Sequence, residues 1–305
     1  MLDAHPQLAV SNDPHFIHEG LRKSGGRDAP LTSEHVERVL ACRTLSRLGL
    51  SDDELRKAAA GAETYGEFVG AIYTAFAQSR GKRLAGEKTA RYVRYLPLLD
   101  ALFPWAKTLH LVRDGRDVAL STLEWARPDR GPGRYGLWRE EPIAVCALSW
   151  RWHVTTGQRD GSLRGPSLYQ EVRYEALAAH PEQTMRRVSA FLDLPFAPET
   201  LAFHAGRTRR GEALPSKDRW LPPTPGLRDW RDEMAPRDLE LFEAVAGDAL
   251  SALGYEVVHD HVSREVATLA ARCRASWEQE VRAQWPRKAS RLEFDLRPRE
   301  YAGIP

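Results

Sequence analysis

The stretch Lys107-Thr-Leu-His-Leu-Val-Arg-Asp-Gly-Arg-Asp-Val-Ala-Leu-Ser121 decides the fold of this chain. Its first residues, 107–112, are apolar and partly β-branched, which predicts a short buried strand. Asp114-Gly115 breaks this run, and the residues from Asp117 onward have helical composition. The stretch therefore predicts a strand, a sharp turn and a helix.

This turn is also a candidate anion site. A strand-to-helix junction places backbone N–H groups and the positive end of the helix dipole beside Arg113 and Arg116, which favours a phosphate. Ser121, eight positions after Arg113 and about two helical turns further on, can add a hydroxyl donor. Arginines that follow a strand also form surface ion pairs, and the residues alone leave this alternative open.

The segment from Val112 to Ser121 resembles the 3′-phosphate-binding segment of the PAPS-dependent sulfotransferases, particularly bacterial members similar to tyrosylprotein sulfotransferases. The resemblance implies that Arg113 and Ser121 hold the 3′-phosphate of the donor, 3′-phosphoadenylyl sulfate (PAPS). It implies an α/β fold in which helices flank a parallel sheet, with a P-loop-like, nucleotide-kinase-like architecture. The implied reaction moves a sulfuryl group from PAPS to an acceptor hydroxyl and releases PAP.

The first residues, Met1 to Pro6, resemble the end of the helix that follows the family's donor-binding Pro-Arg-Ser-Gly-Thr-Thr loop. No such loop occurs in the sequence, although its glycine-rich turn normally cradles the 5′-phosphosulfate. We therefore expect a domain that lacks its first strand and this loop, through a start codon placed too late or through natural loss. In the second case the chain is a catalytically inactive, PAP-binding or regulatory protein.

Two carboxylates are candidates for the base that accepts the proton of the acceptor hydroxyl. Counted from the Asp-Ala-His-Pro anchor, Asp13 falls where family members often carry a glutamate. Its carboxylate is one methylene shorter, which matters because a base must reach hydrogen-bond distance of the proton. The rival base is Glu87, because some carbohydrate sulfotransferases use a glutamate at the corresponding position. A turn or cap residue before Pro14 is the structural alternative for Asp13.

The segment from Arg83 to Tyr92 resembles the family's strand-end motif Gly-Asp-Lys-Thr-Pro-Arg-Tyr. The resemblance places Lys88 beside the bridging oxygen of the phosphosulfate, where an ammonium neutralises charge on the leaving group. Glu87 and Ala90 depart from the Asp and Pro of the motif. The alternative is a surface pair of Glu87 and Lys88.

Two further contacts to the donor follow from the resemblance. Ser167 to Glu175 reads as a strand that resembles the family's Val-Arg-Tyr-Glu-Asp-Leu, and Tyr174 matches a tyrosine that contacts the nucleotide. A structural tyrosine at a strand end is the alternative. Residues 203–229 are loop-like, and Ser216 is the nearest candidate for a serine that the family places near the sulfuryl group. Trp230 fits the tryptophan that starts the last helices.

Other patterns predict structure rather than chemistry. Ser51 to Glu54 is a capping-box pattern, and an apolar stripe from Tyr65 to Phe76 at helical spacing predicts a core-facing helix. The arginine-bearing loop of residues 127–139 is either an acceptor-binding segment or a solvated loop. The resemblance covers about residues 1–256, so we predict an N-terminally incomplete sulfotransferase-like domain over 1–256 and a helical extension with a tail over 257–305.

Composition limits the partners of the chain. With 305 residues, 42% of them hydrophobic, it can bury a large core, and a net charge of +2 gives no electrostatic case for nucleic acid or an anionic membrane. Three widely spaced cysteines predict neither disulfides nor a zinc site, and His259-Asp-His261 is too small a set for a metal. No apolar run is long enough for a membrane span, so we predict a cytoplasmic protein. The expected donor is PAPS without a metal, and the acceptor can be a sugar, a peptide tyrosine, a lipid or a small molecule.

Overall fold

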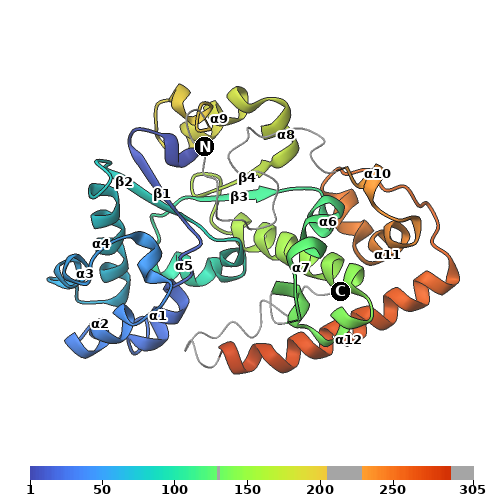
Figure 1. Cartoon of the computed structure of the whole chain (residues 1–305), viewed down its shortest axis with the longest axis horizontal. Coiled ribbons are helices and arrows are strands. Elements are labelled where there is room, and N and C mark those ends of the chain that lie inside the picture. The colour runs from blue at the N-terminus through green and yellow to red at the C-terminus, as the bar shows by residue number, and fades with distance from the viewer. Residues whose placement is uncertain (129–130, 205–228, 290–305) are drawn as a thin grey trace. The chain divides into compact units, whose positions relative to one another are not determined.

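The computed structural model describes residues 1–128, 131–204 and 229–289. These residues fall into two compact units. Unit 1 holds Met1–Ala106 and the described part of Leu192–Arg207, and unit 2 holds Lys107–Phe191 and the described part of Thr208–Arg287. Each unit contains a two-stranded parallel sheet with helices packed around it (Figure 1). The α/β class with parallel strands flanked by helices is therefore confirmed.

Unit 1 is built on strands β1 and β2. Its elements in chain order are η1 (Leu2–Ala4), β1 (Leu8–Asn12), α1 (Ile17–Lys23), α2 (Ser33–Leu40), η2 (Leu45–Leu48), α3 (Asp52–Ala59), α4 (Tyr65–Gln78), β2 (Leu84–Lys88), η3 (Ala90–Tyr95), α5 (Leu96–Leu102) and η6 (Pro198–Thr200). The two strands pair in parallel from Leu8 opposite Leu84 to Asn12 opposite Lys88. The two chain segments that follow these strands therefore leave the sheet side by side.

Helix α4 supplies much of the core of unit 1. It contacts both strands, and Phe68, Ile72 and Phe76 on its inner face are completely buried. The predicted apolar stripe is thus core. The predicted capping box is also confirmed, because the Ser51 hydroxyl accepts from the backbone N–H of Glu54 and the Glu54 carboxylate accepts from that of Ser51.

Unit 2 is built on strands β3 and β4. Its elements in chain order are β3 (Thr108–Val112), α6 (Gly115–Trp125), η4 (Gly131–Arg134), η5 (Gly136–Arg139), α7 (Pro142–Ser162), β4 (Tyr169–Arg173), α8 (Tyr174–Ala179), α9 (Pro181–Phe191), α10 (Trp230–Glu233), α11 (Pro236–Ala252) and α12 (Arg264–Ala289). The strands pair in parallel from Thr108 opposite Tyr169 to Val112 opposite Arg173. Helix α7 packs against α6 and α11 and lies beside α6 in Figure 1.

The predicted strand, turn and helix are present at the start of unit 2, with two differences. Helix α6 begins at Gly115 rather than at Asp117, because the Asp114 carboxylate caps it by accepting from the backbone N–H of Arg116 at 2.9 Å. Strand β3 is less buried than predicted, and Leu111 leaves 55% of its surface exposed. Among the described residues β3 pairs only with β4, so no neighbouring strand shields its other edge.

Helix α12 packs onto unit 2, and its largest buried side chain is Trp277. Trp277 is only 2% exposed and contacts the rings of Tyr135 and Trp152, with ring centroids 4.3 and 6.1 Å away. Three residues further on, the Glu280 carboxylate accepts from the backbone N–H groups of Gly136 and Leu137. The helix predicted as a C-terminal extension thus buries part of the arginine-bearing segment before α7.

Candidate functional site

The carboxyl ends of β1 and β2 bring two predicted residues together. Lys88 ends β2 opposite Asn12, and Asp13 follows directly after β1. The backbone N–H of Asp13 donates to the carbonyl of Lys88 at 2.8 Å, which continues the ladder by one residue. The Lys88 ammonium then lies 2.7 Å from Oδ2 of Asp13. Register alone therefore pairs the predicted base with the predicted leaving-group lysine.

The Asp13 side chain lies in a turn that is tied to the rest of unit 1. Asp13 and His15, on either side of Pro14, both have φ of 55°, in the left-handed region. Arg47 donates to the backbone carbonyl of Asp13. On the other side, Nε2 of His15 lies 3.7 Å from Oδ1 of Asp13, and both side chains are 30% exposed. The carboxylate therefore faces a cation on one oxygen and an imidazole on the other.

Glu87, the rival base, has a different environment. Its carboxylate accepts from the hydroxyl of Tyr73 and from Oγ1 of Thr89 at 2.6 Å. Burial raises the pKa of Glu87, although these hydrogen bonds act to lower it. The Glu87 carboxylate therefore serves as an acceptor for two hydroxyl groups of unit 1.

In unit 2 the carboxyl ends of β3 and β4 bring a second predicted pair together. Arg113 follows β3, and Tyr174 follows β4 at the first position of α8. The Arg113 guanidinium lies over the Tyr174 ring, 4.6 Å from its centroid. It also donates to Oδ2 of Asp117 at 2.9 Å, while the indole N–H of Trp150 donates to the Arg113 carbonyl at 3.0 Å. The side chain that the resemblance assigns to the 3′-phosphate is thus held in place by its neighbours.

Asp117 was not singled out in the sequence, yet it connects two parts of unit 2. Its second carboxylate oxygen accepts from the backbone N–H of Trp230 at 3.1 Å, at the start of α10. Burial raises the pKa of Asp117, although Arg113 acts to lower it. The spacing of four between Arg113 and Asp117 is a signal that could have identified this ion pair.

The backbone of the β3–α6 corner is occupied, contrary to the sequence expectation. The N–H of Asp114 donates to Glu175 at 2.8 Å and that of Arg116 donates to Asp114, so these two N–H groups are not available to a phosphate. Arg116 itself is fully buried, bonded to Asp114 and, at 2.7 Å, to Glu243. It also lies 3.5 Å from the Trp230 ring centroid. Arg113, in contrast, reaches the surface of the corner, with 21% of its side chain exposed.

The remaining predicted residues are placed as follows. Ser121 lies on α6, eight residues after Arg113, and is partly exposed. Ser216 lies outside the described residues. The nitrogen Nδ1 of His259 lies 2.7 Å from the carboxylate of Glu243, the residue to which Arg116 donates, so this histidine has a structural partner.

Three observations concern the other classes of site. The cysteines Cys42, Cys146 and Cys273 are free and buried. In the part of the chain that the structure describes, no group of three or more His, Cys, Asp or Glu side chains is arranged to hold a metal ion. Within the same part, no helix combines the length and apolar character needed to cross a membrane.

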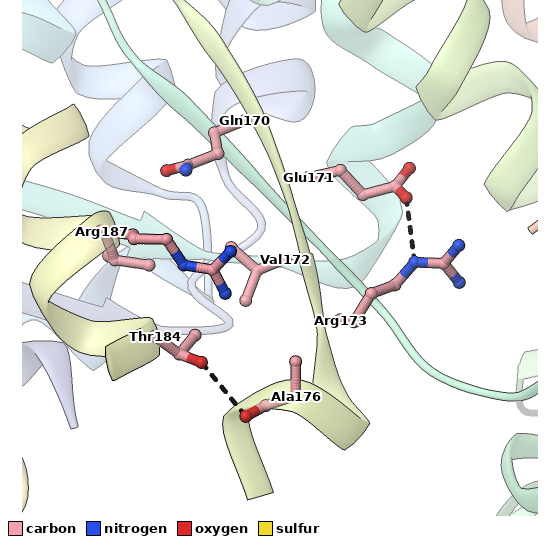
Figure 2. Close-up of a pocket in the computed structure, with 8 residues that line it drawn as sticks. Gln170, Glu171, Val172, Arg173, Ala176, Thr184 and Arg187 are labelled. Carbon is pink, nitrogen blue, oxygen red and sulfur yellow. Dashed lines mark hydrogen bonds and ion pairs between the residues drawn. The ribbon is translucent and has the colours of Figure 1, made fainter. Parts of the chain in front are cut away.

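A small cavity lies between β4, α8 and α9 in unit 2. It measures about 160 Å³ and is lined by residues 170–173 together with Ala176, Thr184, Arg187 and Val188. Figure 2 shows Gln170, Val172 and Arg187 on one face of β4, and the Glu171–Arg173 ion pair, 3.3 Å long, on the other. Neither Arg113 nor Tyr174 lines this cavity, so it is separate from the predicted nucleotide contacts.

Comparisons with known proteins agree on one family. Residues 1–198 match the family described as "Sulfotransferase family". The nodulation protein NoeE of Sinorhizobium fredii is 29% identical over 100% of this chain and 72% of its own length. Protein-tyrosine sulfotransferase A of Caenorhabditis elegans is 25% identical over 66% of this chain, and carbohydrate sulfotransferase 5 of Mus musculus is 29% identical over 57% of it. The chain spans 47% of each of these last two relatives.

A solved structure supports the same fold. The sulfotransferase domain from the Synechococcus PCC 7002 olefin synthase has a TM-score of 0.51 and 20% sequence identity, over 85% of this chain and 99% of that domain. This likeness concerns the fold alone. The family match over residues 1–198 confirms the family and the enzyme class predicted from the sequence. The chain therefore belongs to the sulfotransferase family.

Proposed function

We propose that this chain transfers the sulfuryl group of PAPS to an acceptor hydroxyl and releases PAP. The observation that carries the proposal is the stacking of Arg113 on Tyr174, 4.6 Å from the ring centroid. These two predicted nucleotide contacts come from separate segments and meet at the carboxyl end of one parallel strand pair. In open α/β sheets this is the end at which ligands bind.

Arg113 and Ser121 are proposed to hold the 3′-phosphate. A guanidinium stacked on a ring keeps its in-plane N–H groups available, and it can donate two parallel hydrogen bonds to one phosphate. Arg113 donates from one Nη to Asp117 at 2.9 Å, so the orientation of its guanidinium group is already fixed before the ligand binds. Because backbone N–H groups of Asp114 and Arg116 are occupied, we assign the phosphate to side chains.

Asp13 and Lys88 are proposed to act at the reacting centre. The acceptor hydroxyl gives its proton to the Asp13 carboxylate while its oxygen forms the new bond to sulfur. The bond between sulfur and the bridging oxygen breaks, and its electron pair stays on the 5′-phosphate of PAP. Lys88 then stabilises the negative charge on that phosphate. Ser216, which is outside the described residues, is the candidate that the resemblance gives for a contact to the sulfuryl group. The 2.7 Å contact between Asp13 and Lys88 supports roles at one centre.

We assign the base to Asp13 rather than to Glu87. The Asp13 carboxylate is partly exposed and contacts two side chains that carry hydrogen-bond donors. The Glu87 carboxylate accepts from the Tyr73 hydroxyl on one oxygen and from the Thr89 hydroxyl on the other, so each oxygen already has a partner. A base needs a lone pair that the substrate proton can reach.

The acceptor is proposed to be a hydroxyl of a sugar or a tyrosine. Two relatives of this chain are named as a protein-tyrosine sulfotransferase and a carbohydrate sulfotransferase, and both tyrosine and carbohydrate carry hydroxyl groups. The test is a transfer assay in which the purified chain is incubated with radiolabelled PAPS and a panel of tyrosine peptides and oligosaccharides. Label should appear on an acceptor, and Asp13→Asn and Lys88→Ala should each reduce the rate by roughly 100-fold or more.

The alternative function predicted from the sequence is that of a PAP-binding or regulatory protein without transferase activity. A chain that binds PAP through Arg113 without holding the 5′-phosphosulfate is a binding or regulatory protein. The same assay separates the two functions. PAP binding without transfer to any acceptor would support the second one.

A further inference from the structure

The turn formed by Asp13, Pro14 and His15 has an unusual backbone conformation and is bonded to other parts of unit 1. The φ of Asp13 and His15 is 55°, a left-handed conformation that residues other than glycine rarely adopt. The turn is held by the bond from Asp13 N–H to the Lys88 carbonyl and by Arg47 on the Asp13 carbonyl. These contacts from two other segments hold the conformation.

The consequence of this backbone is that the ring of His15 turns back toward Asp13. Its Nε2 lies 3.7 Å from Oδ1, whereas the Lys88 ammonium lies 2.7 Å from Oδ2. Nδ1 of His15 is buried and has no hydrogen-bond partner among the described residues. A neutral ring carries its proton on one nitrogen, and a lone pair facing a carboxylate is repelled. The tautomer with the proton on Nε2 therefore suits this position.

We propose that His15 is a positioning residue, whose Nε2–H faces Oδ1 of Asp13 across 3.7 Å and moves into hydrogen-bond distance in the complex with the acceptor, where it keeps the carboxylate oriented toward the acceptor hydroxyl. This inference rests on the proposed function, in which Asp13 is the base. Lys88 has a second task at the leaving group, so it cannot orient Asp13 throughout the reaction. A donor on the other oxygen keeps the orientation when the ammonium turns to the phosphosulfate.

The charge state of His15 is consistent with this role. Burial lowers its pKa below the usual 6.5, Asp13 acts to raise it, and Arg91, Arg47 and Lys88 lower it further. At neutral pH the ring is therefore an uncharged donor. It orients the carboxylate without the full positive charge that would make Asp13 a weaker base. As the pH falls through the pKa of His15, the imidazolium that forms should make Asp13 less basic and reduce turnover.

The pairing can be tested without any activity measurement. The pKa of His15 is followed by NMR titration in the wild-type chain and in Asp13→Asn. Because the Asp13 charge raises the pKa of His15, the substitution should lower it. The matched control is Glu19→Gln, whose carboxylate acts on His18, and it should leave the pKa of His15 unchanged. An unchanged His15 pKa in Asp13→Asn would overturn the proposal, even if the chain transfers sulfuryl groups.

Kinetics then test the positioning role. His15→Phe should lower kcat roughly tenfold and leave the affinity for PAP unchanged, because misplacing a reacting group slows only the chemical step. His15→Gln, which retains an N–H donor near the position of Nε2, should restore kcat to within about threefold and remove the low-pH loss of turnover. His18→Phe, which keeps a ring against Tyr95, is the control and should match the wild type.

Three outcomes are decisive. If His15→Phe is as active as the wild type, or if His15→Gln keeps the low-pH limb, the positioning role is wrong. A wild-type chain that transfers nothing from PAPS refutes the proposed function instead, and with it the catalytic part of this inference. In that case the NMR comparison still decides whether His15 and Asp13 are paired.

Discussion

At the scale of single residues, access to lone pairs distinguishes two neighbouring carboxylates. Lys88 and Asp13 form a partly exposed pair at 2.7 Å, whereas Glu87 accepts hydrogen bonds inside unit 1. Removing an exposed ion pair costs little stability, but replacing an acceptor that two donors share leaves at least one of them unsatisfied. Amide substitution should therefore reduce activity at Asp13 and stability at Glu87.

Asp13→Asn should reduce sulfuryl transfer roughly 100-fold or more and change the free energy of unfolding by less than about 1 kcal/mol. Glu87→Gln should lower the free energy of unfolding by about 1–3 kcal/mol, because the hydroxyls of Tyr73 and Thr89 then share one acceptor oxygen. Transfer assays and urea titrations of both variants check this. A stable but inactive Glu87→Gln, beside an active Asp13→Asn, would make Glu87 the base.

At the scale of elements, the β3–α6 corner depends on a close approach between helices. A Cβ built on Gly115 would lie 2.4 Å from the Trp150 ring of α7, and Trp150 also donates to the Arg113 carbonyl. Bulk at Gly115 therefore displaces the tryptophan that fixes the backbone of Arg113. The first residue of α6 links the packing of the helix to the candidate phosphate site.

Gly115→Ala should destabilise the chain by about 1–3 kcal/mol through overpacking. It should also weaken PAP binding, because Trp150 must move. Gly70→Ala in α4, where a Cβ meets nothing within 4 Å, is the control and should stabilise the chain by roughly 0.5–1 kcal/mol. Thermal denaturation and calorimetry with PAP measure both effects. Equal stability of the two variants would show that the contact with Trp150 does not limit the corner.

Helix α12 is expected to stabilise unit 2. Trp277→Ala removes a side chain that is 2% exposed between Tyr135 and Trp152, and it should cost about 3–5 kcal/mol. Trp105→Ala, at a tryptophan that is 67% exposed, should stay within about 0.5 kcal/mol of the wild type. Urea unfolding of the two variants makes the comparison. A negligible effect of Trp277→Ala would mean that α12 is not part of the cooperative unit.

At the scale of the whole molecule, each unit contains a histidine that resists protonation. Burial, followed by the charges of Arg22 and Arg91, lowers the pKa of His18 to about 4. Burial and Arg173 lower the pKa of His110 to about 4. The unfolded chain, with pKa values near 6.5 for histidine, therefore binds more protons than the folded chain between these pH values.

Stability should consequently fall as the pH is lowered from about 6.5 toward 4, by on the order of 1–2 kcal/mol for each imidazole at pH 5. Urea unfolding at pH 7 and pH 5 measures the difference. His18→Phe removes the titrating ring of unit 1 and should reduce the pH dependence. A stability that is constant or that rises on acidification over this range would show that the two rings are accessible to protons.

The sequence predicted those features whose causes are local. An apolar run and the Asp114-Gly115 break defined the corner from β3 to α6, and helical spacing defined the buried face of α4. The predicted start of α6 was two residues too late because the sequence analysis did not consider Asp114 as its cap. The predicted residues Asp13 and Lys88 meet because strand register brings segments 75 residues apart together, and only the resemblance indicated it.

Features that depend on distant partners were not predictable from spacing. Arg116 looks equivalent to Arg113 in the sequence, but Glu243, 127 residues away, bonds it in the interior. The ring of His15 and the packing of Trp277 likewise depend on tertiary contacts. The roles assigned to the site residues, the domain limits 1–256 and 257–305, the PAPS donor and the cytoplasmic location remain predictions. These site residues are Asp13, Lys88, Arg113, Ser121, Tyr174 and Ser216.

The most direct test of the account is calorimetry with PAP on the wild-type chain, on Arg113→Ala and on Arg187→Ala. We expect the wild type to bind PAP and Arg113→Ala to lose about 2–3 kcal/mol of binding free energy, which is roughly a 30- to 150-fold rise in Kd. Arg187→Ala, at the separate cavity beside β4, should bind PAP with wild-type affinity. Equal affinity of Arg113→Ala and the wild type, or no binding of PAP by the wild type, would contradict the account.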